Sequence, residues 1–272
     1  MKLSFTTMAT PKLDGAEAIK TAAKYGYNGV DLRVSDVMGE LSLNSTLQEI
    51  NELKNIFSME GIEPSGLLCY NEAGTDEPSS WKGMTESILK NIEIAYALGS
   101  PTIRIFGGNP YQYKNHGDHI SRTADSIAEA LRKSSNNITV LMQNHQGGYS
   151  AADVINLAAI VNDRRFGLAF SPDHCVIMGE NLRELYDSVK PVTSQIYFSD
   201  LYRKGDQFDC AMPGKGCVPL EETYTAMCAG GFDGWLTFKW EKIWRPELEE
   251  PEAALPYFID YIDKLIEYST EE

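Results

Sequence analysis

The sequence lacks any apolar run long enough to cross a membrane. No stretch approaches the ~20 consecutive apolar residues that a membrane-spanning helix requires. The opening segment, MKLSFTTMATPKLDG, alternates as a strand does and lacks the apolar core of a signal peptide. We therefore expect no membrane partner and a cytoplasmic location.

Positive charge is also scarce. The chain has 24 lysines and arginines against 39 aspartates and glutamates, which gives a net charge of −15. Proteins that bind nucleic acid neutralise phosphates with clustered basic residues, so this balance argues against a nucleic-acid partner. It indicates instead a solvated acidic exterior, which favours solubility.

The cysteines are too few and too scattered to predict a disulfide framework. There are five, an odd number, and no CxxC motif joins any two of them. Cys210 and Cys217 share an expected loop and could pair or bind a metal, but their spacing supports neither. Reduced thiols, the usual state in the cytosol, are the expectation.

What the sequence does contain is a regular alternation of strand-like and helical patterns. Strands are expected at 2–7, 29–34, 64–70, 102–107, 139–145, 167–171, 195–201 and 235–241, and helices near 15–25, 45–59, 81–98, 117–134, 151–161, 182–189, 219–229 and 251–268. Eight strand–helix units predict one (β/α)8 TIM barrel domain over residues 1–272. A doubly wound open sheet is the alternative, but no GxGxxG follows the first strand. The longest expected loops, 71–80, 109–119 and 202–218, would lie at the C-terminal face of the barrel, where ligands bind.

The last expected strand, 235–241, carries a lysine on the face that points into the barrel. Apolar side chains alternate along it with Thr237, Lys239 and Glu241, and alternate residues of a strand share a face. A buried lysine is costly unless it is paired or used. The same alternation places Gln143, Ser171 and Tyr197 beside Lys239 at the top of the barrel interior.

Six motifs stand in order along the predicted units. They are IRIFGGNP at 103–110, MQNHQGG at 142–148, FSPDH at 170–174, IYFSDLYR at 196–203, PGKGCVPL at 213–220 and GFDGWLTFKWEKIWRPELEEPE at 231–252. With these motifs the whole chain resembles the xylose-isomerase-like barrel family, which comprises sugar and sugar-phosphate isomerases and epimerases of the tagatose-epimerase and hydroxypyruvate-isomerase kind. The resemblance implies a ligand site for a sugar at the C-terminal face of the barrel.

The resemblance also implies one divalent metal, held by a glutamate, an aspartate, a histidine and a second glutamate at four strand ends. There the metal polarises a carbonyl while the two glutamates shuttle a proton. This chain has Gln143, Ser171, Tyr197 and Lys239 at those positions. An amide, a hydroxyl, a phenol and an ammonium do not suit a hard dication, so we expect neither a metal nor another cofactor.

Other parts of the family pattern are retained. His174 closes the FSPDH motif, where the family contacts its substrate, and Arg203 follows Tyr197 by six residues, where its epimerases place a substrate-binding arginine. Arg104 and His145 are also in place, together with Asn144. From the residues themselves, Trp244 in the loop after the last strand could stack on a sugar face.

Three interpretations of Lys239 remain open. It is a cation standing where the metal stood, paired with a carboxylate such as Glu241 or Asp200. It is a catalytic base or an amine that forms a Schiff base with a keto-sugar. Or it has no function and its amino group reaches solvent.

The predicted function is that of a sugar or sugar-phosphate isomerase or epimerase that acts on or binds a small sugar or keto-sugar without the family's metal. Lys239, Tyr197 and His174 are the expected acid–base groups. The expected substrate contacts are Gln143, Ser171, Arg203, Arg104, His145 and Trp244.

Two alternatives stay open at this stage. The first is a non-catalytic carbohydrate-binding pseudoenzyme or partner subunit. The second is a metal held by Asp173, His174, His145 and Glu241, which are suitable ligand types. The sequence also leaves open whether the chain forms a homo-oligomer.

Overall fold

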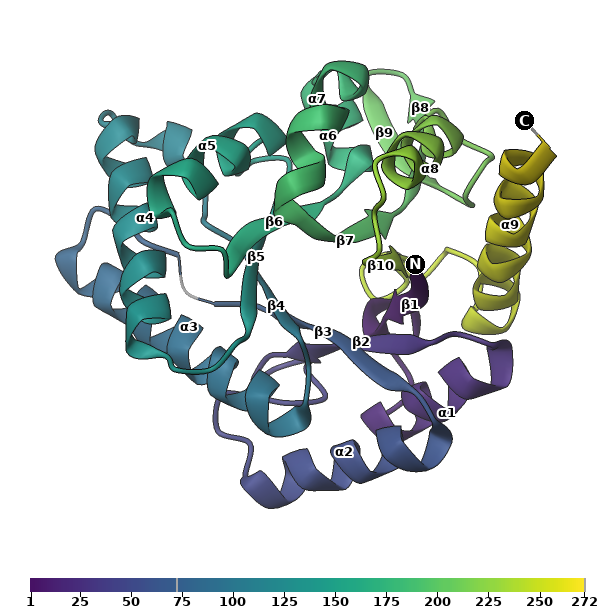
Figure 1. Cartoon of the computed structure of the whole chain (residues 1–272), viewed down its shortest axis with the longest axis horizontal. Coiled ribbons are helices and arrows are strands. Elements are labelled where there is room, and N and C mark those ends of the chain that lie inside the picture. The colour runs from purple at the N-terminus through teal and green to yellow at the C-terminus, as the bar shows by residue number, and fades with distance from the viewer. Residues whose placement is uncertain (72, 272) are drawn as a thin grey trace.

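A computed structural model of the chain describes residues 1–71 and 73–271. Eight parallel strands close into a barrel (Figure 1), as the alternating pattern predicts. The strands are β1 (Lys2–Thr6), β2 (Gly29–Val34), β3 (Glu63–Cys69), β4 (Thr102–Ile105), β5 (Thr139–Gln143), β6 (Phe166–Phe170), β7 (Thr193–Phe198) and β10 (Trp235–Phe238). The barrel closes where β10 pairs with β1, so that Leu236 lies beside Leu3 and Phe238 beside Phe5.

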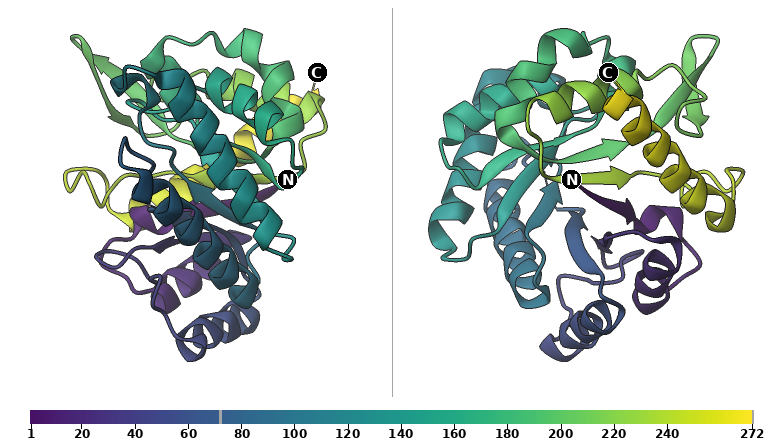
Figure 2. Two further views of the ribbon diagram at one scale, coloured as in Figure 1. Left: turned by 90° about the vertical axis from the view of Figure 1, so that its left-hand side faces the viewer. Right: turned by 45° about the vertical axis from the view of Figure 1, so that its right-hand side comes forward.

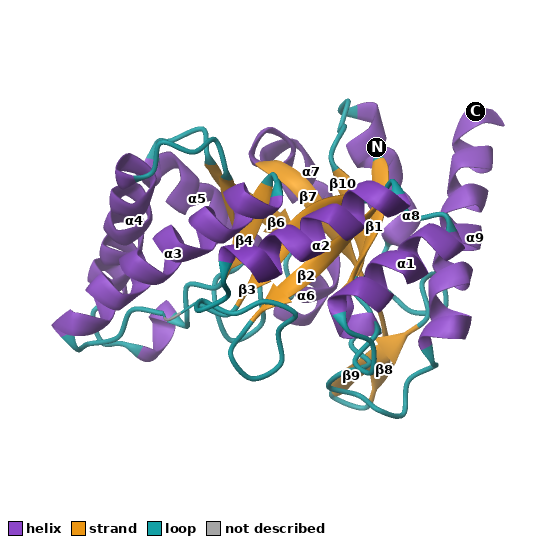
Figure 3. Cartoon of the chain, turned by 90° about the horizontal axis from the view of Figure 1, so that it is seen from below, coloured by secondary structure: helices purple, strands orange, loops and turns teal. Residues whose placement is uncertain are grey.

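Helices form the outer layer around the barrel (Figure 3). They are α1 (Gly15–Tyr25), α2 (Leu47–Glu60), α3 (Pro78–Leu98), α4 (His116–Lys133), α5 (Ala151–Val161), α6 (Pro172–Met178), α7 (Leu182–Val189), α8 (Leu220–Ala229) and α9 (Pro251–Glu271), with single 3-10 turns at Thr7–Ala9, Pro110–Gln112 and Lys190–Val192. Within the described part of the chain, no helix combines the length and the apolar character that spanning a membrane requires.

Local sequence sets where helix α1 begins and ends. The Asp14 side chain accepts a hydrogen bond from the backbone of Glu17, whose carboxylate accepts one from the backbone of Asp14 in return. This capping box satisfies two of the unpaired N–H groups at the start of a helix. Gly26 ends the helix at φ +82°, a left-handed conformation that glycine adopts at no steric cost. The chain is thereby turned back into β2.

The structure differs from the sequence prediction at two elements. An unpredicted helix, α6, follows β6 directly, because Pro172 occupies its first turn, where a proline is well tolerated. The loop expected at 202–218 begins with a hairpin of β8 (Asp200–Lys204) and β9 (Gln207–Ala211), which turns at Gly205 with φ +63°. This hairpin projects from the barrel (Figure 2) on the same side as α6 (Figure 3).

Three predicted strands, 102–107, 139–145 and 235–241, also extend beyond the ends that the structure shows. Strand β4 ends at Ile105, β5 at Gln143 and β10 at Phe238. Lys239 and Glu241 therefore lie just beyond β10 in the chain, at the C-terminal end of the barrel. The backbone of Lys239 still pairs with β7, because its N–H donates to the carbonyl of Phe198 at 2.9 Å, so strand alternation extends to this residue.

The interior of the barrel is unusually polar below its middle. Asp31, Gln195 and Thr237 are fully buried there, and Nε2 of Gln195 donates to both Oδ2 of Asp31 and Oγ1 of Thr237. Above them lies a small apolar cluster of Met8, Leu68, Leu141, Ala169 and Tyr197. The main hydrophobic core lies outside the barrel, between the strands and the helices. A cavity opens above the interior cluster, at the C-terminal ends of the strands.

Candidate functional site

The cavity at the C-terminal end of the barrel has a volume of about 340 Å³. Its walls come from the ends of β4 and β5, from α6 and from the segment after β10, and they include Arg104, Gln143, His174, Lys239 and Trp244. A second cavity of about 660 Å³ lies against it, lined in part by α6 and the β8–β9 hairpin. Both cavities are lined by His145, His174, Glu241 and Trp244. These four side chains are therefore reachable from two sides.

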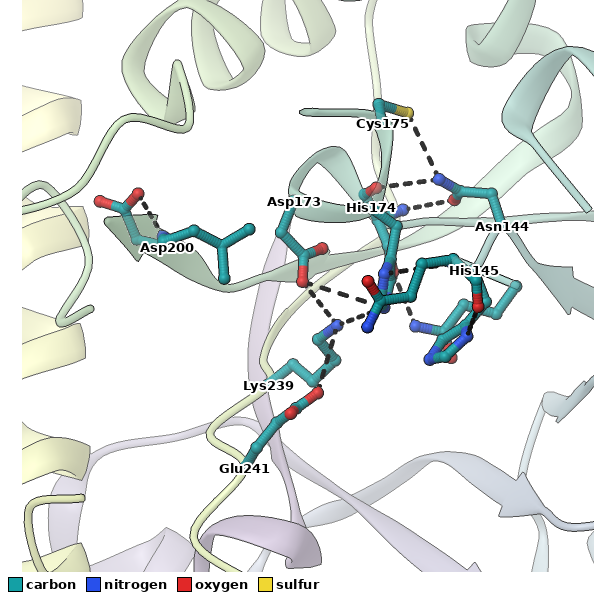
Figure 4. A network of polar contacts seen from close by, with 12 residues as sticks. Asn144, His145, Asp173, His174, Cys175, Asp200, Lys239 and Glu241 are labelled. Carbon is teal, nitrogen blue, oxygen red and sulfur yellow. Dashed lines mark hydrogen bonds and ion pairs between the residues drawn. The ribbon is translucent and has the colours of Figure 1, made fainter. Parts of the chain in front are cut away.

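Lys239 is the centre of a buried polar network in this wall (Figure 4). Its Nζ atom lies 2.7 Å from Oδ2 of Asp173, 3.1 Å from Nε2 of His174 and 3.7 Å from Oε1 of Glu241. Only 3% of its side chain is exposed. The interpretation in which the Lys239 amino group reaches bulk solvent is therefore wrong, and the pairing with Glu241 is confirmed.

The pairing of Lys239 with Asp200 is wrong. The buried Asp200 carboxylate points away from Lys239 (Figure 4). It accepts hydrogen bonds from the backbone N–H groups of Leu201, Gly214, Gly216 and Val218. Asp200 thus shapes the chain between β9 and α8 rather than the Lys239 network.

Asp173 supplies the principal counter-charge, and a helix rather than a continued strand sets its direction. It belongs to helix α6, not to a strand, so it can turn back over the end of the barrel toward Lys239. Its other oxygen, Oδ1, is buried without a hydrogen-bond partner among the described residues. The short helix after β6 is what brings this carboxylate into the site.

The protonation state of Lys239 follows from its neighbours. Burial alone would lower the pKa of Lys239, but the charges of Asp173 and Glu241 outweigh burial and raise it above its ordinary value. Lys239 is therefore an ammonium at neutral pH. A Schiff base requires the neutral amine, so this environment disfavours the nucleophilic role.

Two neutral imidazoles stand beside the ammonium. Burial first, and then the Lys239 charge, lower the pKa of His174 well below its ordinary value. The same two causes lower the pKa of His145 to about 4. The two rings are 4.0 Å apart between centroids. Nδ1 of His145 lies 2.7 Å from the carbonyl oxygen of Gln146, which assigns the ring proton to Nδ1 and leaves Nε2 as an acceptor.

Gln143 and Ser171 bind each other. Nε2 of Gln143 donates to Oγ of Ser171 at 2.8 Å, and only Gln143 of the two lines the cavity. Asn144 joins the ends of β5 and β6. Its side-chain amide donates to the carbonyl of Ser171 at 2.9 Å and accepts from the N–H of Ser171 at 2.8 Å. Asn144 thereby sets the register of His145 against α6.

Tyr197 lies below the cavity rather than on its wall. Its hydroxyl donates to Oδ2 of Asp31 at 2.8 Å, and Gln195 donates to the same oxygen at 2.9 Å. Burial raises the pKa of Asp31 to about 6, against the opposing effects of Tyr197 and Arg104. Asp31 was not among the residues predicted from the sequence, although a signal was present. It alternates with Val30 and Leu32 in GVDLRV and so points into the barrel.

The predicted substrate contacts divide into two groups. Arg104, Gln143, His145 and Trp244 line the cavity, and Trp244 is 51% exposed. Arg203 lies on the exposed part of the β8–β9 hairpin, where its Nε donates to the carbonyl of Gly205 at 3.3 Å. It lines neither cavity, because the hairpin carries it away from the barrel.

The donors at the four implied metal positions do not suit a divalent metal. The Gln143 amide and the Ser171 hydroxyl bond to each other, Tyr197 bonds to Asp31, and Lys239 is a cation. The alternative ligand set around Asp173 and Glu241 surrounds the Lys239 ammonium instead. Throughout residues 1–71 and 73–271, no group of three or more His, Cys, Asp or Glu side chains is arranged to hold a metal ion.

Comparison with known proteins agrees with this architecture. A family model described as xylose isomerase-like TIM barrel matches residues 19–265. None of the curated protein sequences matches the chain.

Several solved structures share the fold over the whole chain. The D-psicose 3-epimerase from Clostridium cellulolyticum H10, solved with D-tagatose, has a TM-score of 0.80 at 15% identity, covering 97% of this chain and 99% of that one. The IOLI protein, solved with a zinc atom, has a TM-score of 0.81 at 16% identity, covering 98% of both chains. The 3-keto-D-glucoside 4-epimerase from E. coli has a TM-score of 0.76 at 13% identity, covering 97% and 99%. At these identities the likeness shows the fold alone.

Proposed function

Since the chain belongs to the xylose isomerase-like TIM barrel family, we propose that it acts as an isomerase or epimerase on a small sugar or keto-sugar, without a divalent metal. The observation that carries the proposal is the Lys239 ammonium. It is held in the cavity wall by Asp173 at 2.7 Å and stands beside two neutral histidines. Structural relatives whose names describe sugar epimerases support the substrate class.

The chemistry of such a reaction needs two groups. A base removes a proton from the carbon next to a carbonyl, and a positive group stabilises the negative oxygen that develops. The Lys239 ammonium suits the second role, because Asp173 and Glu241 keep it charged. It would donate a hydrogen bond to the substrate carbonyl oxygen, where a metal would otherwise act as a Lewis acid.

The base must be neutral or anionic before the reaction. His174 and His145 both meet this condition, since burial and Lys239 keep their imidazoles unprotonated. Nε2 of His174 already faces the ammonium at 3.1 Å. Nε2 of His145 is the freer acceptor, because Nδ1 carries the ring proton. In the proposed reaction the neutral His145 takes the carbon-bound proton and becomes an imidazolium, and an enediolate forms against Lys239. The same imidazolium returns the proton to the neighbouring carbon, while the hydroxyl proton of the enediolate passes to the former carbonyl oxygen.

The same ion pair favours a second function, the non-catalytic binding of a carbohydrate. Lys239 is 3% exposed and is held by two carboxylates, so its charge is largely satisfied without a substrate. In that case Trp244 and Gln143 would bind the sugar and no proton would be transferred.

Exchange of carbon-bound hydrogen in deuterium oxide tests both functions. The purified protein is incubated with D-fructose, D-tagatose and D-psicose, and deuterium incorporation is followed by proton NMR. We expect incorporation by the wild type, a loss of about 100-fold or more in Lys239→Met, and no loss after treatment with a chelator. The matched control is Lys190→Met, which removes a lysine paired with Asp187 before β7, at the opposite end of the barrel.

The outcomes separate the proposals. Equal exchange by the wild type and Lys239→Met contradicts the role of Lys239. Saturable sugar binding with no exchange supports the non-catalytic function. Exchange that disappears with the chelator and returns with added manganese or zinc contradicts metal independence.

A further inference from the structure

Arg104 is a buried cation in the cavity wall whose charge is not matched by a carboxylate. It stands on β4, is 2% exposed and lines the 340 Å³ cavity. Within the described part of the chain, none of the ion pairs up to 4.0 Å involves Arg104. The guanidinium of an arginine is a permanent cation in proteins. Leaving it buried and unpaired is costly.

The hydrogen-bond donors of Arg104 are poorly satisfied. Nε has no partner among the described residues. One terminal nitrogen reaches the carbonyl oxygen of Cys69 at 3.5 Å, which is at the limit of a hydrogen bond. The guanidinium also acts on the Tyr197 hydroxyl, both as a charge and as a hydrogen-bond donor, and so lowers the pKa of Tyr197 against the larger effect of burial. Nε thus lacks an acceptor among the described residues, and the contact with Cys69 is weak.

The rings of Tyr70 and Phe106 lie against the guanidinium. Its central carbon is 4.1 Å from the centroid of Phe106 and 5.2 Å from that of Tyr70. Aromatic faces stabilise a cation but accept no N–H hydrogen bond in the guanidinium plane. They hold the group in place and leave its in-plane donors as the means of binding.

The contrast with Lys239 indicates what Arg104 is for. Lys239 has Asp173 at 2.7 Å and Glu241 at 3.7 Å, so a neutral ligand suffices there. Asp31 reaches Arg104 only by way of Tyr197, because its Oδ2 accepts the Tyr197 hydroxyl. The cavity therefore has one cation that the protein neutralises and another that it does not.

From this difference we propose that the substrate carries a carboxylate, which Arg104 binds in the cavity while Lys239 faces the reacting carbonyl. The fork of guanidinium donors matches a planar carboxylate with two parallel hydrogen bonds. The inference rests on the proposed function of the cavity and narrows it to acidic sugars of the uronate class. A phosphate would draw on the same charge, so the two anions are compared directly in the test.

The experiment measures binding rather than turnover. Dissociation constants are determined by isothermal titration calorimetry for D-glucose, D-glucuronate and D-glucose 6-phosphate, which differ only at one end of the sugar, and for the pair D-galactose and D-galacturonate. We expect each uronate to bind the wild type at least about tenfold more tightly than its neutral sugar and more tightly than the phosphate. Arg104→Gln should remove this preference, and Arg104→Lys should keep part of it, because lysine retains the charge without the fork.

The control is Arg183→Gln, which removes an exposed arginine of α7 that pairs with Glu222 and should leave every dissociation constant unchanged. Three results with the wild type overturn the proposal, whether or not the Arg104 variants fold. They are equal binding of neutral sugars and uronates, tighter binding of glucose 6-phosphate than of uronates, and no uronate binding. A uronate preference that survives in Arg104→Gln overturns the role of Arg104. Absence of deuterium exchange on a uronate that the protein binds contradicts only the isomerase activity, so the two failures are distinguishable.

Discussion

Nζ of Lys239 and Oδ2 of Asp173 lie 2.7 Å apart, and each side chain is about 3% exposed. Removing one member of a buried ion pair leaves the other charge without compensation, which typically costs 3–5 kcal/mol. We therefore expect Lys239→Met to lower the free energy of unfolding by roughly 3 kcal/mol or more, as measured by urea denaturation. Lys190→Met, whose lysine is paired nearer the surface, should change it by less than about 1 kcal/mol.

A double-mutant cycle isolates the pair itself. Asp173→Leu alone should also destabilise, because it leaves Lys239 with only the more distant Glu241. The double variant Lys239→Met/Asp173→Leu should be less destabilised than the sum of the two single variants, by at least about 1 kcal/mol. Additive effects would mean that the short contact contributes nothing of its own.

A second prediction concerns the buried Asp31. Burial raises the pKa of Asp31 to about 6 in the folded protein, whereas its ordinary pKa is near 3.8. As the pH rises, the unfolded chain therefore loses this proton at a lower pH than the folded protein does. The stability that Asp31 contributes is full below about pH 4 and is lost as the pH rises to about 6. The stability of Asp31→Asn relative to the wild type should therefore increase by roughly 2 kcal/mol between pH 4 and pH 7 and stay constant above that.

Urea denaturation at each pH measures this difference, and Asp36→Asn, at an exposed position, is the control substitution. An amide at position 31 can still accept from Tyr197 and can donate to Oε1 of Gln195, which has no partner among the described residues. A pH-independent difference between Asp31→Asn and the wild type would mean that Asp31 is ionised throughout this range.

The barrel and the face of Lys239 could be predicted because strand alternation is a local property. In 236–241, apolar and polar residues alternate without interruption, and β10 does place Thr237 inside the barrel. The Glu241 pairing was also predictable, since Glu241 lies two residues from Lys239. These inferences needed no knowledge of distant segments.

Asp173 and Arg203 mark where such reasoning stops. Asp173 reaches Lys239 because the chain leaves β6 as a helix, and FSPDH alone does not distinguish that from a continued strand. Arg203 leaves the cavity because residues after Asp200 pair with β9 as a hairpin. Both outcomes depend on which structure follows a strand end, which tertiary contacts decide. The same applies to Arg104, whose missing counter-charge is visible only when its neighbours are known.

A third prediction follows from the surroundings of His145. Burial and the Lys239 charge lower its pKa to about 4, so its imidazole should remain neutral through the range in which an ordinary histidine titrates, near 6.5. NMR titration of labelled histidine should give a midpoint near 4 and the Nδ1–H tautomer at neutral pH. In Lys239→Met the midpoint should move upward. A midpoint near 6.5 in the wild type would contradict the proposed environment.

The lowered pKa of His145 also makes the stability of the protein depend on pH. The folded state of His145 binds its proton less readily than the unfolded chain, so its contribution is present above about pH 6.5 and is lost as the pH falls to about 4. The proposed base is likewise available above about pH 4. Deuterium exchange that falls steeply below pH 6.5 in the wild type would therefore point to a base other than His145.

The last prediction decides between two roles of Tyr197. As a catalytic acid it would have to touch the substrate, but its hydroxyl lies below the cavity and donates to Asp31 at 2.8 Å. Burial keeps its pKa well above the ordinary value, so the phenol remains a donor. We expect Tyr197→Phe to retain deuterium exchange within about threefold, because it removes no group from the cavity wall.

Tyr197→Phe should also raise the pKa of Asp31 further, since the Tyr197 hydrogen bond lowers that pKa. The profile of stability against pH, compared with that of Asp31→Asn, measures this second effect. A loss of exchange of about 100-fold with an unchanged Asp31 profile would instead assign Tyr197 to the reaction and require substrate to reach the apolar layer of the barrel.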